Sequence, residues 1–293
     1  MKMLSKIAAQ SINSGPQHDL DRKQNALRSR LESLGSVLVA YSGGTDSAYL
    51  AWSAHKVLGQ RMLAVLADSA SLPRRELKLA IEFAEQWQIP LKVIATEELE
   101  RPDYVRNDAN RCFHCKDELF TLMERVRGEI GFDHIAYGKN IDDERDFRPG
   151  QRAAQEHRVF SPLAEAGLTK NDIRALARRA GLAVWDKPAS ACLSSRIEYG
   201  RPVTREALAA IEAGEDALRE LGFEQARVRH HGEVIRIEIA RDDLGRAFTP
   251  EMAMRLVPIF KKLGFKYVTL DCEGYRSGSM NLVLPVEQIK KAN

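Results

Sequence analysis

The stretch that decides the fold is VLVAYSGGTDSAYLAWSAHKV, residues 37–57. Its four apolar residues at 37–40 predict a buried strand, and residues 47–57 predict a helix that follows almost directly. A polar loop with two glycines joins the two elements. Such a loop places backbone N–H groups and a helix N-terminus at the carboxyl end of the strand, where they can bind a phosphate group.

Each residue type in this loop suits a bound phosphate. The loop consists of Ser42, Gly43, Gly44, Thr45, Asp46 and Ser47. The glycines let backbone N–H groups close around an anion, the hydroxyls add donors, and Asp46 can orient Mg²⁺ or bond to an amide at the helix start. The spacing matches neither the kinase-like P-loop nor the dinucleotide-binding glycine motif. The alternative is a strand-to-helix turn that merely uses small residues, and we favour phosphate binding.

The alternation of strands and helices continues outward from this loop and predicts an α/β fold with a parallel sheet. Further strands are predicted at 62–66, 91–94 and 134–137, with a short one near 159–160, and helices at 21–34, 74–87, 113–127 and 169–180. A second set of elements predicts a smaller α+β unit: a helix at 202–221, a hairpin at 226–239, a helix at 250–263 and a strand at 267–270. We expect a flexible leader at 1–19, an α/β domain at 20–186 and a C-terminal α+β domain at 187–293.

The overall composition is that of an ordinary globular protein. The 293 residues include 44 basic and 41 acidic side chains, so the net charge of +3 is too small to indicate a dedicated nucleic-acid-binding protein. Apolar runs are short, and we expect neither a signal peptide nor a membrane span, which makes the cytoplasm the expected location. Four cysteines are too few and too scattered for a secreted disulfide framework.

Three of the cysteines form a candidate reactive site. Cys112 and Cys115 lie in NRCFHCK, residues 110–116, where both thiols share one face in the first turn of a predicted helix. We expect the helix N-terminus, Arg111 and Lys116 to lower the pKa of both thiols. Cys192 follows in a loop-like stretch, and the three thiolates can converge in the fold.

Three thiolates suit an iron–sulfur cluster better than a structural zinc ion. They can hold a 4Fe-4S cluster and leave one iron open, whereas structural zinc takes four protein ligands. There are three alternatives: a zinc ion with His114 as the fourth ligand, a redox pair, or a purely structural role in which Cys115 or Cys192 is a small buried side chain. We favour the cluster, and we place Cys272, which follows the apolar strand at 268–270, in the core.

Two sets of motifs resemble known proteins. The loop at 42–47 resembles the SGGxDS loop of the PP-loop ATP pyrophosphatases, which cleave ATP to AMP and pyrophosphate while adenylylating a substrate oxygen. The segments WDKP at 185–188, ACLSSR at 191–196 followed by YG at 199–200, and EGYRSGSMN at 273–281 resemble the LarE family of ATP-dependent sulfur transferases. Taken together, the resemblance extends over about residues 20 to 285.

The resemblance implies a specific reaction. It implies conversion of pyridinium-3,5-dicarboxylate mononucleotide to the bisthiocarboxylate, on the route to the nickel-pincer cofactor of lactate racemase, with ATP and Mg²⁺. In single-cysteine members, the cysteine that matches Cys192 gives up its own sulfur and becomes dehydroalanine. Because Cys112 and Cys115 are also present, this chain resembles the three-cysteine branch, in which a 4Fe-4S cluster presents a hydrosulfide on its open iron. The resemblance also implies a homo-oligomer, and a sulfide or sulfur donor is a further expected partner.

Basic residues supply candidate phosphate ligands. Arg227 and Arg229 alternate along a predicted strand, so both point to one face. Spacing alone favours a solvated face, but the resemblance implies contact with the substrate phosphate. Arg196 and Glu238 are weaker candidates of the same kind. Lys116 can stabilise charge at the α-phosphate of ATP or simply lie on a helix face, and we favour the catalytic role.

Two other groups of polar residues are less decisive. Asp142 and Asp143 can help to bind Mg²⁺ or can cap a turn, and we leave both alternatives open. Arg276, in the turn after the last predicted strand, is expected to be structural or to contact another subunit.

Three other functions share parts of this pattern. A tRNA thiolation enzyme uses the same activation, but the sequence has neither a zinc-ribbon cysteine set nor a basic arm. An amide-forming synthetase needs an ammonia source, and we find no glutaminase segment that supplies one. A non-catalytic nucleotide or metal sensor would bind ATP without releasing AMP. We therefore favour a sulfur transferase that does not bind nucleic acid.

Overall fold

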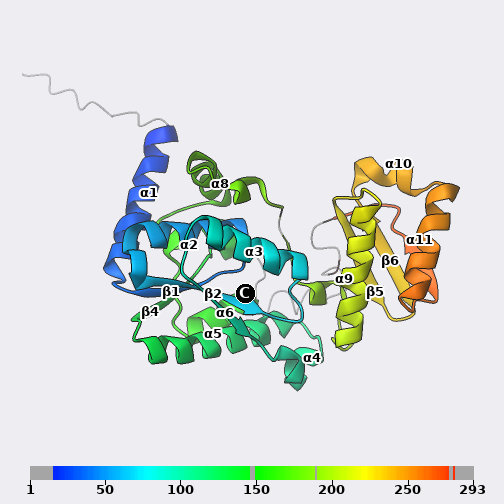
Figure 1. The fold of residues 1–293 in the computed structure, drawn as a ribbon, viewed down its shortest axis with the longest axis horizontal. Coiled ribbons are helices and arrows are strands. Elements are labelled where there is room, and N and C mark those ends of the chain that lie inside the picture. Colours follow the sequence, from blue (N-terminus) through cyan, green and yellow to red (C-terminus); the bar gives the residue numbers. More distant parts are fainter. Residues whose placement is uncertain (1–15, 146–148, 189, 277–279, 281–293) are drawn as a thin grey trace, which may run out of the picture.

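Two α/β units lie side by side along the long axis of the molecule (Figure 1). The structure is a computed structural model, and it describes residues 16–145, 149–188, 190–276 and 280. Among these residues, no helix is both long enough and apolar enough to cross a membrane.

The larger unit is built on a four-stranded parallel sheet with the order β3-β2-β1-β4. Its strands are β1 (Val37–Ala40), β2 (Met62–Asp68), β3 (Leu91–Ala95) and β4 (His134–Tyr137). Its helices are α1 (Pro16–Ser33), α2 (Thr45–Leu58), α3 (Arg74–Gln86), α4 (Pro102–Val105), α5 (Arg111–Ile130), α6 (Pro149–Glu156), α7 (Pro162–Glu165) and α8 (Lys170–Arg179). Because all four strands run in one direction, their carboxyl ends lie at one edge, where the candidate site lies.

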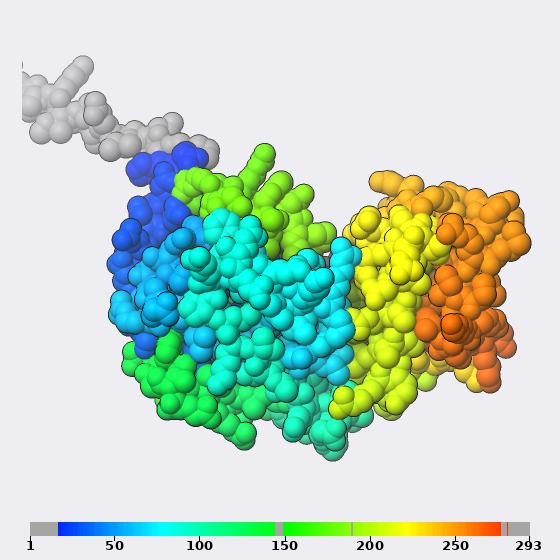
Figure 2. Space-filling view, in the orientation of Figure 1, coloured from blue at the N-terminus to red at the C-terminus, as the bar shows by residue number. Residues whose placement is uncertain are grey.

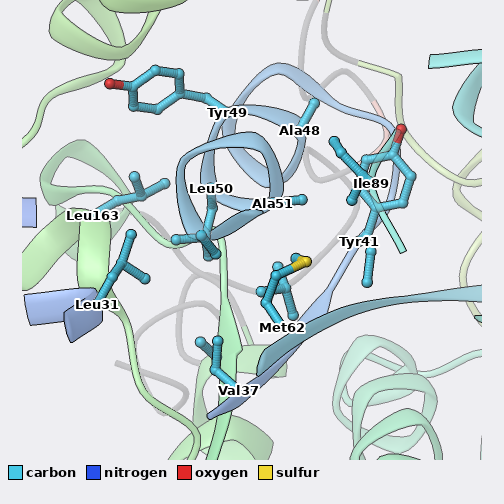
Figure 3. Close-up of a cluster of buried hydrophobic side chains, with 14 of the residues drawn as sticks. Leu31, Val37, Tyr41, Ala48, Tyr49, Leu50, Ala51, Met62, Ile89 and Leu163 are labelled. Carbon is cyan, nitrogen blue, oxygen red and sulfur yellow. The ribbon is translucent and has the colours of Figure 1, made fainter. Parts of the chain in front are cut away.

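Strand β1 is buried on both faces, as its unbroken apolar sequence predicts. Val37 and Val39 pack in a cluster with α1, α2, α3 and α8, part of which is drawn in Figure 3. Leu38 and Ala40 point the other way, into a second cluster with α5 and α6. Alternation of side chains along a strand therefore supplies both cores from four residues.

The smaller unit has the sheet order β5-β6-β7, in which β5 and β6 are antiparallel and β6 and β7 are parallel. Its elements are α9 (Arg205–Glu220), β5 (Ala226–His231), β6 (Val234–Ile239), α10 (Leu244–Ala247), α11 (Pro250–Lys262) and β7 (Tyr267–Leu270). Apolar residues of β5 and β6 pack with all three helices in one core. The side chains that alternate with these apolar residues on β5 and β6 include Arg227, Arg229, Arg236 and Glu238, so the other face of the sheet is polar.

The two units are joined by backbone hydrogen bonds and by a shared core. The N–H of Gly200 donates to the carbonyl of Asn107 at 3.0 Å, and that of Val203 donates to Val105 at 2.9 Å. Tyr104, on α4 of the larger unit, is buried in the core of the smaller one. In Figure 2 the two units meet along a furrow in the surface.

The predicted fold class is confirmed, and its differences from the structure are local. Helix α1 begins at Pro16, before the expected start of the folded part at residue 20, and α5 begins at Arg111 rather than at 113. The short strand expected near Phe160 is only an isolated bridge to Ala136, because the chain turns into α7 directly afterwards. The domain boundary at 186 stays a prediction.

Replacing Asn107 with alanine is expected to lower the free energy of unfolding by about 2 to 3 kcal/mol. Asn107 is fully buried, has φ of 57°, and donates from its side-chain amide to the carbonyls of Glu198 and Arg201, each at 2.9 Å. Alanine would leave both carbonyls without this donor and tolerates the left-handed conformation less well. Urea denaturation followed by circular dichroism measures the change. The exposed Asn171→Ala is the control, and equal midpoints for the two variants would contradict the assignment.

Candidate active site

The glycine loop after β1 packs closely against α3 and is fixed by hydrogen bonds of its own. Gly43 has φ of 71°, and a Cβ atom there would lie 2.6 Å from the Cβ of Ala80 on α3. The Ser47 hydroxyl donates to the carbonyl of Gly44 at 3.1 Å and accepts from the N–H of Ser42, also at 3.1 Å. These contacts fix the backbone at the N-terminus of α2, where the partial positive charge of the helix favours an anion.

Asp46 is fixed from two other segments. The ammonium group of Lys170, at the start of α8, lies 2.8 Å from the Asp46 carboxylate, and the Asn140 amide donates to it at 3.3 Å. Thr169 and Asp172 form a capping box that fixes the first turn of α8 and therefore the backbone of Lys170. Asp46 thus lies in the glycine loop with its charge already paired.

A second lysine supports the other side of the loop. Lys187 donates to the carbonyl of Gly43 at 3.0 Å and forms an ion pair with Glu76 of α3 at 2.7 Å. The Thr45 hydroxyl donates to the carbonyl of Val184 at 2.8 Å. The segment around WDKP therefore supports the loop through Lys187, and Lys170 supports it through Asp46. The sequence alone did not predict either contact.

The two aspartates after β4 make turn contacts. Asp142 accepts from the N–H of Lys170 at 2.8 Å, and Asp143 accepts from the N–H of Asn140 at 3.1 Å. Of the two alternatives for these residues, the observed contacts are those of turn and helix capping. Gly138 at the end of β4 lets this turn approach α2, because a Cβ there would lie 2.8 Å from the N atom of Ser47.

The segments that carry the three candidate cysteines lie next to one another. Cys112 and Cys115 occupy the first turn of α5, and Cys192 directly precedes a short 3-10 helix, Leu193–Arg196. The guanidinium of Arg111 donates to the carbonyl of Ser194 at 2.9 Å and so joins the two segments, and a negative charge on Cys192 would raise the pKa of both other thiols. The sulfur of Cys192 lies 3.0 Å from the Ser194 hydroxyl.

The expectation that both thiols of α5 have lowered pKa values is wrong. The surrounding protein raises the pKa of Cys112 above its ordinary value, although its surface reaches solvent and the Arg111 guanidinium acts in the opposite direction. Burial raises the pKa of Cys115 further, and the buried carboxylate of Glu98 adds to the effect. Desolvation of a thiolate therefore outweighs the nearby cations, so these thiols favour the neutral form until a cation or metal compensates them.

No group of three or more Cys, His, Asp or Glu side chains in the described part of the chain is placed to hold a single metal ion. This includes the set considered for zinc, Cys112, Cys115 and Cys192 with His114. A cubane cluster makes a different demand, because each thiolate binds a different iron and the sulfurs need not converge on one point. Three neighbouring thiols fit the donor chemistry of such a cluster.

Arg111 joins the two cysteine-bearing segments. It is only 3% exposed, and it donates to the Asn107 side chain and, at 2.9 Å, to the carbonyl of Ser194. Its guanidinium also lies 5.5 Å from the centre of the Tyr199 ring. The sequence analysis considered Arg111 only as a nearby charge; the bonds to residues 194 and 107 depend on a loop fold that spacing does not reveal.

The Cys192 segment is also tied to the edge of the parallel sheet. The N–H of Leu193 donates to the carbonyl of Ser71, in the turn after β2, at 2.8 Å. The Ser71 hydroxyl is paired with that of Tyr104 at 2.5 Å. Because β1 and β2 are adjacent and parallel, this contact places Cys192 at the same sheet edge as the glycine loop.

The three predicted phosphate-binding arginines differ in their environments. Arg196 is 2% exposed and forms an ion pair with Glu215 at 2.9 Å; it also donates to the carbonyl of Cys192. Arg229 is paired with Glu238 at 2.7 Å. In this arrangement Arg196 supports the Cys192 loop, and a phosphate would reach it only if the ion pair with Glu215 opened.

Lys116 lies on α5 beside the thiols. Its ammonium group is 5.8 Å from the centre of the Phe120 ring, and its side chain packs on α6. A Cβ atom added at Gly150 would lie 2.9 Å from Cγ of Lys116. Gly150 therefore leaves the space that this lysine occupies.

Two further expectations can be compared with the structure. Cys272 is exposed rather than in the core, because β7 ends at Leu270 and the chain has already turned away. Arg276 pairs with Glu273 at 2.6 Å, in agreement with a structural role.

The comparisons with known proteins agree with this geometry. A family model described as NAD synthase matches residues 20–135. A pyridinium-3,5-bisthiocarboxylic acid mononucleotide synthase from Lactiplantibacillus plantarum is 34% identical over 92% of this chain and 98% of its own length. Uncharacterised proteins of Synechocystis and Methanocaldococcus jannaschii are 41% and 30% identical, over 90% and 82% of this chain and 99% and 91% of their own lengths.

With a glycine loop at the carboxyl edge of a parallel sheet and a relative of this identity aligned along nearly the whole chain, the protein belongs to the LarE-like family of PP-loop ATP pyrophosphatases.

Proposed function

We propose that this enzyme adenylylates a carboxylate of pyridinium-3,5-dicarboxylate mononucleotide and replaces a carboxylate oxygen with sulfur. The observation that carries the proposal is the hydrogen bond from Leu193 to Ser71, which holds Cys192 at the sheet edge that also bears the nucleotide loop. The 34% identical relative from Lactiplantibacillus plantarum, a pyridinium-3,5-bisthiocarboxylic acid mononucleotide synthase, supports the same substrate class. The oligomeric state and the sulfur source stay predictions.

The first step uses the glycine loop. The loop from Ser42 to Ser47 would hold the pyrophosphate part of ATP, with Mg²⁺ near Asp46. An oxygen of the substrate carboxylate forms a bond to the α-phosphorus while the bond from that phosphorus to the leaving pyrophosphate breaks. The resulting acyl adenylate carries AMP as a leaving group, which a bare carboxylate lacks. Lys116 would stabilise the negative charge that gathers on the α-phosphate.

The second step takes place beside the cysteines. A sulfur nucleophile forms a C–S bond to the activated carbon as the C–O bond to AMP breaks. Cys112, Cys115 and Cys192 would hold a 4Fe-4S cluster, which when bound supplies an iron with an open position for a sulfur ligand. Arg111 would compensate part of the charge of the thiolates, and Arg227 with Arg229 would bind the mononucleotide phosphate. The alternative is single-turnover donation of the sulfur of Cys192 itself.

Asp46→Ala is expected to reduce ATP-dependent release of pyrophosphate by about 100-fold or more, because the loop loses its only carboxylate. The assay measures AMP and pyrophosphate with the mononucleotide present. Asp103→Ala, an exposed carboxylate on α4, is the control and should keep the parental rate. An Asp46→Ala enzyme that also kept that rate would exclude this loop as the nucleotide site.

Anaerobically purified protein is expected to contain about four irons and four acid-labile sulfides per chain. Cys112→Ala, Cys115→Ala and Cys192→Ala should each lose most of this content, whereas Cys272→Ala, exposed beyond β7, should retain it. Metal analysis, sulfide analysis and the visible spectrum are the measurements. Metal-free parental protein that thiolates one substrate and loses the mass of hydrogen sulfide at Cys192 would instead establish the sacrificial route.

Gly150→Ala is expected to slow pyrophosphate release by about 10- to 100-fold, because the new methyl group displaces the side chain of Lys116. Gly128→Ala on α5, where a Cβ meets nothing within 4 Å, is the matched control. In a Lys116→Ala background, Gly150→Ala should have no further effect. Equal losses in both backgrounds would show that Gly150 acts on something other than Lys116.

A further inference from the structure

The chain after β7 makes a tight turn at Gly274 and Tyr275, against the end of β6. Gly274 has φ of 72°, and a Cβ atom there would lie 2.8 Å from the carbonyl oxygen of Ile239. The N–H of Tyr275 donates to this same carbonyl at 2.9 Å. Residue 274 must be glycine because its φ is positive and a Cβ atom would have no space. The turn therefore fixes the position of the Tyr275 backbone.

The ring of Tyr275 lies against Arg227. The Arg227 Cζ atom is 5.1 Å from the ring centre, within the range of a cation–π contact. Arg227 lies on β5, and β6 separates β5 from β7 in the sheet. The turn that follows β7 crosses the end of β6 and so brings the Tyr275 ring to Arg227. Arg227 also donates to the carbonyl of Ala226 at 2.7 Å.

Arg227 differs from its two neighbours in how its charge is compensated. Each of the neighbours, Arg196 and Arg229, is buried against a glutamate carboxylate. Among the described residues, no carboxylate forms an ion pair with Arg227, although Glu238 lies opposite it on β6. The Glu238 carboxylate pairs instead with Arg229 at 2.7 Å and with Arg236 at 3.4 Å.

Because Arg196 and Arg229 are already paired with glutamates, Arg227 is the arginine of these three best suited to bind an added anion. Burial lowers the pKa of Arg227, and the nearby cation of Arg196 lowers it further. A dianionic phosphate placed beside Arg227 would relieve both effects without breaking an ion pair. The ring of Tyr275 limits the conformations of the guanidinium before any ligand arrives, which reduces the entropy that binding must remove.

We infer that Tyr275 is a positioning residue that orients Arg227 toward the phosphate of the mononucleotide substrate, beside the glutamate-paired Arg229. This inference rests on the proposed function, because it takes the phosphate monoester of that substrate as the ligand. It also gives Gly274 a role, because the turn at this glycine places the Tyr275 ring against Arg227.

The test compares Tyr275→Leu with Tyr275→Phe in the full-length protein. Isothermal titration calorimetry measures the Kd for pyridinium-3,5-dicarboxylate mononucleotide and, separately, for ATP. Tyr275→Leu should weaken mononucleotide binding about fivefold to tenfold and leave the ATP Kd unchanged, since the ring but not the ATP loop is altered. Tyr275→Phe, which keeps the ring, should bind like the parent. Tyr267→Leu, which removes a tyrosine that is 61% exposed on β7, is the matched control.

A double-mutant cycle separates positioning from general damage. In an Arg227→Ala background, Tyr275→Leu should cause no further loss of mononucleotide affinity. Parental affinity for the mononucleotide in Tyr275→Leu, or an equal loss of ATP affinity, would overturn the inference and leave the proposed function intact. Failure of the parental protein to bind the mononucleotide would overturn the proposed function, and this inference with it.

Discussion

The buried guanidinium of Arg111 is the contact on which the arrangement of the site depends. It links the first turn of α5, which carries two cysteines, to the loop that carries the third. A buried cation is costly unless it is hydrogen-bonded and paired. Asn107 and Ser194 supply hydrogen bonds, and the thiols beside it supply the groups that become anionic when they bind a metal. The same residue thus links the cysteine-bearing segments, and in the proposed function it would also compensate the charge of the cluster-bound thiolates.

At the glycine loop, too, each buried or half-buried charge has a partner of opposite sign. Lys170 contacts it through the Asp46 carboxylate and Lys187 through the carbonyl of Gly43, and each lysine is paired with a carboxylate, Asp46 or Glu76. These contacts hold the loop in shape, and in the proposed function the phosphates of ATP would enter a region where both lysines already have partners. Binding of Mg²⁺ to Asp46 would release Lys170, so occupation of the loop by metal and by nucleotide should be mutually favourable.

The parts of the fold that follow from local pattern could be predicted from the sequence. The strand at 37–40, the glycine loop and the helix after it depend on neighbouring residues, and all three lie where expected. The raised pKa values of Cys112 and Cys115 could not be obtained in this way, because desolvation in the folded chain outweighs the charges nearby in sequence.

The carboxylates that pair with the arginines could not be predicted from the sequence either. Alternation predicts that Arg227 and Arg229 share a face, but it does not show that Glu238 pairs with one and not the other. Arg196 pairs with Glu215 across 19 residues of chain, a contact that only the packing of α9 creates. Roles that depend on which carboxylate reaches which cation require the tertiary structure.

The position of Tyr104 has a consequence for how the chain acquires its structure. This side chain comes from the larger unit, yet it fills the core of the smaller one, and Leu99 and Ala70 pack around the same cluster. A fragment beginning near residue 187 would lack these groups and would have a large cavity in its core. The C-terminal part of the chain should therefore reach its final packing only after the N-terminal part has folded, and the two units should melt as one cooperative block rather than as two independent domains.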